Sequence, residues 1–103
     1  MAWQRVASVE QIEEGEAFPV STGQTHIALV RFGDRVHGIS NVCTHEFALL
    51  SDGIVEDDCI ECPLHQARFD VASGERRSGP ECEHLKTYPT RVDDDGSVLV
   101  DCD

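Results

Sequence analysis

Basic residues are few for a chain of this length and are outnumbered by acidic ones. Eight lysines and arginines stand against 20 aspartates and glutamates, which gives a net charge of −12. Because binding to a phosphate backbone requires a basic face, nucleic acid is excluded as an expected partner. The excess of acid has two interpretations. It keeps the protein soluble, or it forms a negative face that steers the protein onto a basic partner.

Long apolar runs are also missing, and none could span a membrane. The N-terminal stretch MAWQRVASVEQIEEGE has no hydrophobic region of the kind found in signal peptides. We therefore expect a cytoplasmic protein without membrane association, folded as a single domain over residues 1–103. The five cysteines are an odd number, and no export signal accompanies them. Metal binding is a better expectation for them than a disulfide scaffold.

Helical patterns are nearly absent, apart from Ser8–Glu14, which predicts one or two turns with Ser8 as N-cap. Two hairpins are predicted instead, the first with a turn at Gly33-Asp34 and the second with an acidic turn that ends at Gly96. Their strands are residues 26–32 with 35–40, and 87–92 with 97–101. Further short strands are expected around Val6, Phe18, Val20, Ile54, Ile60 and Phe69. This pattern predicts an all-β fold, a sandwich or a barrel.

Two tight Cys–His pairs stand in the middle of the chain. Cys43-Thr-His45 is followed, after sixteen residues (46–61), by Cys62-Pro-Leu-His65. One interpretation is tetrahedral zinc, which accepts two cysteines and two histidines. Common zinc modules place cysteine with cysteine and histidine with histidine, whereas each pair here supplies one of each. This mixture favours a cluster of two unlike irons, one held by cysteines and one by histidines.

The spacing C-x-H, sixteen residues, C-x-x-H resembles the Rieske [2Fe–2S] signature. Over nearly its whole length the chain is similar to the small Rieske ferredoxins of bacterial aromatic-ring-hydroxylating dioxygenase systems, most clearly in GIVEDDCIECPLHQARFDVASGE. The resemblance implies a Rieske fold, an antiparallel β-sandwich with a loop-rich cluster-binding subdomain at about 41–80. It also implies that Ser78-Gly79-Pro80 matches the proline loop that covers the cluster.

The same resemblance implies one [2Fe–2S] cluster per chain. Cys43 and Cys62 would hold the buried iron, and His45 and His65 would hold the outer iron. The chain would then be a monomeric electron carrier and not itself an enzyme. It would take single electrons from an NADH-dependent flavoprotein reductase and pass them to a terminal oxygenase in aromatic hydrocarbon catabolism.

Three alternatives remain open from the sequence. The first is the Rieske-type small subunit of an assimilatory nitrite reductase. The second is the Rieske domain of an oxygenase α subunit, an enzyme that would need a further iron site of two histidines and a carboxylate beyond these 103 residues. The third is a zinc-bound interaction module.

Four positions depart from the pattern of the respiratory Rieske proteins. Ala48 and Leu64 stand where those proteins carry a disulfide, so no such bridge can form here. Ala67 and Phe69 stand where they carry a serine and a tyrosine that donate hydrogen bonds to sulfur. With fewer donors to stabilise the reduced state, we expect a reduction potential at the low end of the Rieske range, about −150 mV.

Other cysteines and histidines are interpreted as structural. Cys59 forms a C-x-x-C spacing with Cys62, but the following proline and histidine argue against a thioredoxin-like dithiol, and we expect a buried strand cysteine. Cys82 and His84 form a third C-x-H without a C-P-x-H companion, and are expected to be structural or exposed. The remaining residues of these types are expected to be packing or surface residues, with a free thiol at the last of them: His26, His37 and Cys102.

Overall fold

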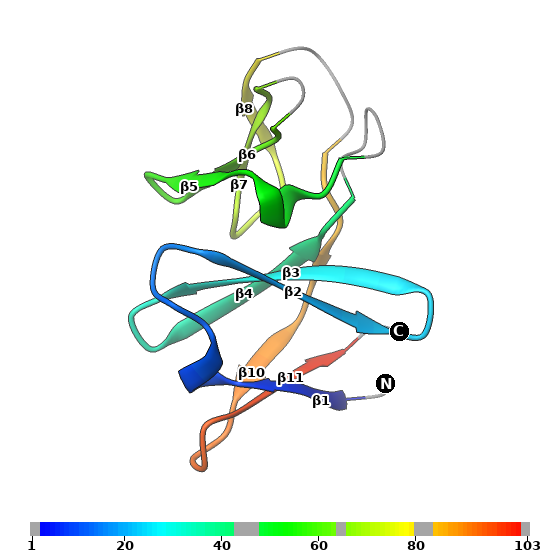
Figure 1. Ribbon diagram of the computed structural model, residues 1–103, viewed down its shortest axis with the longest axis vertical. Helices are drawn as coiled ribbons and strands as arrows, with labels where there is room; N and C mark the ends of the chain where they lie inside the picture. The colour runs from blue at the N-terminus through cyan, green and yellow to red at the C-terminus, as the bar shows by residue number, and fades with distance from the viewer. Residues whose placement is uncertain (1–2, 43–47, 64–65, 80–83, 102–103) are drawn as a thin grey trace.

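The computed structural model describes residues 3–42, 48–63, 66–79 and 84–101, and consists of three antiparallel sheets stacked in layers (Figure 1). The lower sheet has the order β1-β11-β10, the middle sheet β2-β3-β4-β9 and the upper sheet β5-β6-β7-β8. Their bounds are β1 Trp3–Ser8, β2 Ala17–Thr22, β3 Thr25–Phe32, β4 Arg35–Ser40, β5 Ile54–Glu56, β6 Cys59–Glu61, β7 Arg68–Asp70, β8 Arg76–Ser78, β9 Thr87–Tyr88, β10 Thr90–Val92 and β11 Ser97–Asp101. The all-β prediction is confirmed.

The middle sheet is buried on both faces, and this divides the interior into two cores. In β3, Ile27 and Leu29 pack into the lower core against β11, whereas Ala28 and Val30 pack into the upper core. All four side chains have no exposed surface. Because alternate residues of a strand point to opposite faces, a continuous apolar run is what a central strand requires. A fully buried valine, leucine or isoleucine contributes about 1.5–3 kcal/mol.

Both predicted hairpins form. Gly33 takes the positive φ of +66° that the first turn needs, between the paired residues Phe32 and Arg35. The second hairpin joins β10 to β11. However, the strand predicted over 87–92 is wrong as a single element, because it divides at Pro89 into β9 in the middle sheet and β10 in the lower sheet. Proline has no N–H to donate to a sheet, so the chain changes sheets there.

The helix predicted over Ser8–Glu14 is much shorter than expected. It is one 3-10 turn, η1 (Val9–Gln11), and the backbone N–H of Ser8 donates to Oε1 of Gln11 at 2.8 Å. The turn ends because Ile12 becomes extended and enters the lower core with 1% of its surface exposed. A second 3-10 turn, η2 (Leu50–Asp52), precedes β5. In the described ranges, no helix has the length and apolar character needed to cross a bilayer.

The upper sheet, residues 54–78, lies within the segment predicted as the cluster-binding subdomain, 41–80. That this segment is a subdomain of its own stays a prediction. Gly74 ties the sheet to the rest of the chain, because its carbonyl accepts the N–H of Leu85 at 2.8 Å. Gly74 has a φ of +78°, and a Cβ built there would run into the carbonyl of Leu85. Only glycine fits this close approach without displacement.

Candidate metal centre

Cys62 follows strand β6 directly and begins the turn that leads to β7. Its backbone N–H donates to the carbonyl of Ala67 at 2.9 Å, and its carbonyl accepts the N–H of Gln66 at 3.0 Å. Gln66 has a φ of +61°, in the left-handed region that non-glycine residues adopt at a cost of about 1–2 kcal/mol. The turn between Cys62 and Ala67 is therefore closed at its base by two backbone hydrogen bonds.

Gly79 packs directly onto this turn. A Cβ at Gly79 would lie 2.7 Å from Cα of Ala67 and 2.8 Å from the carbonyl oxygen of Gln66, and its φ is +91°. The guanidinium of Arg76 donates to the carbonyl of Gly79 at 3.2 Å. Of the predicted proline loop, the described part thus lies against the turn that carries Cys62.

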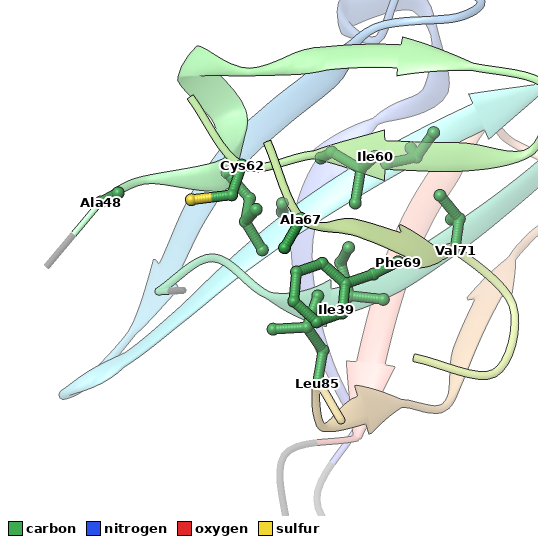
Figure 2. Close-up of a cluster of buried hydrophobic side chains, with 11 residues drawn as sticks. Ile39, Ala48, Ile60, Cys62, Ala67, Phe69, Val71 and Leu85 are labelled. Carbon is green, nitrogen blue, oxygen red and sulfur yellow. The ribbon is translucent and has the colours of Figure 1, made fainter. Parts of the chain in front are cut away.

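The side chain of Cys62 is fully buried in the apolar upper core. Ala67 and Phe69 have no exposed surface, and Ala48 has 6%. Figure 2 shows the sulfur of Cys62 pointing toward the side on which Ala48 lies, whereas Ala67 and Phe69 lie on the other side of Cys62. The side chains of Ala67 and Phe69 offer no hydrogen-bond donor. A buried cysteine side chain on a tight turn, with Gly79 packed against that turn, fits a ligand of a buried iron.

The other predicted ligands lie outside the residues that the structure describes: Cys43, His45 and His65. In the described ranges, no group of three or more histidine, cysteine, aspartate or glutamate side chains is placed to hold a metal ion. The set of four ligands therefore stays a prediction, of which the structure places Cys62.

The residues interpreted as structural largely agree with that interpretation. Cys59 lies in β6, half-buried rather than buried, and no helix follows it in the residues that the structure describes. His26 is exposed on β3, where its Nδ1 lies 3.1 Å from Oγ of Ser21. His37 is half-buried on β4 beside the ring of Phe32. His84 is exposed, whereas Cys82 and Cys102 lie outside the described ranges.

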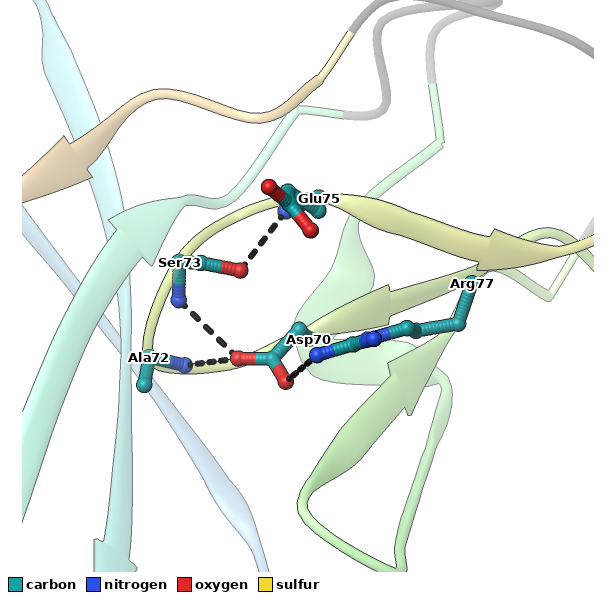
Figure 3. Close-up of polar contacts among 5 residues, drawn as sticks. All are labelled: Asp70, Ala72, Ser73, Glu75 and Arg77. Carbon is teal, nitrogen blue, oxygen red and sulfur yellow. Dashed lines mark hydrogen bonds and ion pairs between the residues drawn. The ribbon is translucent and has the colours of Figure 1, made fainter.

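Sequence reasoning missed a polar hub next to this site (Figure 3). One carboxylate oxygen of Asp70, Oδ1, accepts the backbone N–H groups of Ala72 and Ser73 at 2.9 and 3.0 Å, and Oδ2 accepts the guanidinium of Arg77 at 2.8 Å. The hydrogen bond from Arg77, then that from Ser73, holds the pKa of Asp70 below its usual value. The sequence Asp70-Val-Ala-Ser-Gly74 was a usable turn signal. The pairing of Asp70 with Arg77 could not be predicted, because Arg77 is the extra residue of a β-bulge.

We predict that Asp70 stabilises the protein except in acid. Because its pKa is lowered on folding, its contribution is fully present above the usual value of 3.8 and is lost as the pH falls through the lowered value. Asp70→Asn should therefore lower the unfolding temperature at pH 7, and its difference from wild type should shrink below about pH 4. Far-UV circular dichroism during heating measures this.

Asp93→Asn is the matched control. Asp93 also pairs with an arginine, Arg91 at 2.9 Å, but both side chains are exposed by more than 40%. Exposed pairs contribute about 0–1 kcal/mol, so the control should change little at any pH. Equal effects of the two substitutions at pH 7 would contradict the role of the Asp70 hub.

The family described as the Rieske [2Fe-2S] domain matches residues 2–89. The protein therefore belongs to the Rieske [2Fe–2S] family, whose domain holds a [2Fe–2S] cluster.

Within this family the chain is a ferredoxin. It is 38% identical over 98 residues to the anthranilate 1,2-dioxygenase ferredoxin subunit of Burkholderia cepacia, covering 95% of this chain and 90% of that one. The solved ferredoxin of carbazole 1,9a-dioxygenase from Nocardioides aromaticivorans IC177 has a TM-score of 0.90 and 34% identity, with 97% of each chain covered. Both relatives are named as ferredoxins, which are electron-transfer components rather than catalytic enzymes.

Two further solved structures bear on the partners. A complex of reduced oxygenase and oxidized ferredoxin in carbazole 1,9a-dioxygenase contains a chain that matches this one with a TM-score of 0.87 and 32% identity, over 95% of this chain and 91% of that one. A structure assigned as the NADH-dependent nitrite reductase small subunit of Mycobacterium tuberculosis matches with a TM-score of 0.85 and a lower identity of 25%, over 96% and 93%.

Proposed function

We propose that this ferredoxin carries single electrons from an NADH-dependent flavoprotein reductase to a terminal oxygenase that hydroxylates aromatic rings. The observation that carries the proposal is the full-length likeness, at 38% identity, to the ferredoxin subunit of an aromatic-ring dioxygenase. The solved complex of a similar ferredoxin with its oxygenase supports an oxygenase as partner. The protein would act as a monomer in the cytoplasm.

The residues that would hold the cluster are Cys43, His45, Cys62 and His65. When bound, a Rieske cluster takes up and gives back one electron, and its two histidines raise its potential above that of a cluster held by four cysteines. The chain's contribution is to fix these ligands. Cys62 is held on a turn closed by backbone hydrogen bonds, and its side chain is kept from water.

Metal analysis tests the proposed ligand set. We expect iron and acid-labile sulfide in equal amounts, no zinc, and an electron paramagnetic resonance (EPR) signal after reduction with dithionite. Cys62→Ala should abolish iron binding, because it removes a thiolate ligand. Cys59→Ala is the matched control, since it removes the other cysteine of the C-x-x-C spacing, and it should keep the cluster.

Two outcomes would contradict this ligand set. One is zinc without sulfide in the wild-type protein, which would leave a structural zinc site. The other is loss of iron from Cys59→Ala with retention in Cys62→Ala.

The nitrite reductase small subunit is the second candidate, supported by the solved structure at 25% identity. The genes beside the coding sequence separate the two. Neighbouring genes for a terminal oxygenase and a flavoprotein reductase are expected, and a neighbouring gene for a nitrite reductase large subunit would favour the second candidate.

A further inference from the structure

Among the described residues, only two polar or charged side chains are buried, Asn41 and Asp101. Asn41 is 3% exposed and comes directly after β4, two positions before Cys43. A buried amide is costly unless its polar atoms are hydrogen-bonded. The hydrogen bonds of Asn41 therefore show which segments its buried side chain holds together.

Among the described residues, the side chain of Asn41 makes two hydrogen bonds, both to a single residue ten positions later. Its Nδ2 donates to Oγ of Ser51 at 3.1 Å, and its Oδ1 accepts the backbone N–H of Ser51 at 2.7 Å. The amide and Ser51 thus form a closed pair. The pair joins the end of β4 to η2, across the stretch of sequence that contains Cys43 and His45.

The backbone of Asn41 is held at the same point. Its N–H donates to the carbonyl of His26 on β3 at 2.9 Å, and its carbonyl accepts the N–H of Leu50 at 2.8 Å. An isolated antiparallel bridge also pairs Val42 with Leu49. Asn41 is thus anchored to the middle sheet on one side and to η2 on the other.

The two ligand-bearing segments both have backbone hydrogen bonds at their bases, but the first also has side-chain hydrogen bonds there. The turn from Cys62 to Ala67 is closed by backbone hydrogen bonds, which no side-chain substitution removes directly. The segment between Asn41 and Ser51 is longer, and two of the hydrogen bonds across its base come from one side-chain amide. Loss of that amide would leave the N–H of Ser51 in a part-buried setting without its partner.

We propose that Asn41 is a positioning residue for the first pair of ligands. Through Ser51 it fixes the two ends of the segment that carries Cys43 and His45, and so determines how firmly this segment retains iron. The inference rests on the ligand set proposed above. It assigns to Asn41 a specific effect on metal retention, beyond its share in overall stability.

The test compares metal retention with overall stability in the holoprotein. Asn41→Ala removes both side-chain bonds, and Ser51→Ala removes the Oγ acceptor alone. Val98→Ala is the matched control, because Val98 is fully buried in the lower core and its truncation destabilises the fold away from the site. Bleaching of the visible absorbance by an iron chelator gives the rate of iron release, and heating gives the stability of each variant.

We expect Asn41→Ala to release iron faster than wild type by on the order of tenfold, with Ser51→Ala between the two. Val98→Ala should release iron within about twofold of wild type even though its unfolding temperature falls. The EPR signal of the reduced protein should shift or broaden in Asn41→Ala and stay unchanged in Val98→Ala. A purely structural role of Asn41 would not produce this difference.

If the release rates of all variants follow their unfolding temperatures alone, or if Asn41→Ala and Ser51→Ala both keep the wild-type rate and EPR signal, the inference is overturned while the proposed function stands. Ser51→Ala decides the question should Asn41→Ala fail to fold. If the wild-type protein contains no iron and no sulfide, both the proposed function and this inference are wrong.

Discussion

Gly74→Ala is expected to lower the free energy of unfolding by about 3 kcal/mol, the sum of a left-handed backbone penalty and a steric penalty. The first arises because Gly74 has a φ of +78°. The second arises because the added methyl group would meet the carbonyl of Leu85, whose N–H bonds to the carbonyl of Gly74. For a domain of about 100 residues, this corresponds to a fall in Tm on the order of 15 °C.

Gly15→Ala separates the two penalties. Gly15 has the same φ of +78°, but a Cβ there would meet nothing within 4 Å. It should therefore cost only the backbone penalty of about 1–2 kcal/mol. Thermal unfolding of the two holoproteins side by side measures the difference. Equal falls in Tm would show that the close approach of Gly74 to Leu85 does not matter for stability.

Ala67→Ser and Phe69→Tyr are each expected to raise the reduction potential. Both side chains are fully buried in the same core as Cys62, where they offer no hydroxyl. Reduction adds negative charge, so a new donor to sulfur stabilises the reduced state more than the oxidised state. A hydrogen bond worth about 1 kcal/mol corresponds to about 40 mV for one electron, because a tenfold change is about 59 mV. Voltammetry measures the shift.

Val71→Thr is the control for an added buried hydroxyl. Val71 is 1% exposed and lies in the same core, at the end away from Cys62 in Figure 2. Its substitution should leave the potential unchanged. The explanation from missing donors is wrong if the first two variants keep the wild-type potential while their crystal structures show the new hydroxyls bonded to sulfur.

Much of the fold follows from local rules in the sequence. The apolar run in β3 and the glycine at position 33 determine a central strand and its hairpin without reference to the rest of the chain. Pro89 shows the limit of such rules. Its missing N–H is visible in the sequence, but the move of the chain into another sheet depends on which strands lie nearby.

The candidate site, too, could be predicted from the sequence only in part. The spacing of Cys62 within its motif predicted a ligand on a turn, and the turn is present. The supporting contacts join residues whose proximity is a result of folding, Asn41 with Ser51 and Asp70 with Arg77. No local pattern specifies either pair, because one spans ten positions and the other depends on a β-bulge.

The division of the interior by the middle sheet has a consequence for how the sequence can diverge. The lower core, which contains Val98 and Val100, does not include Cys62, whereas the upper core does. Substitutions of the lower-core residues of β1 and β11 can therefore accumulate over evolutionary time without altering the surroundings of Cys62. Strands β3 and β4 have less freedom to vary, because each places buried side chains in both cores: Ile27, Ala28, Leu29 and Val30 from β3, and Val36 and Ile39 from β4.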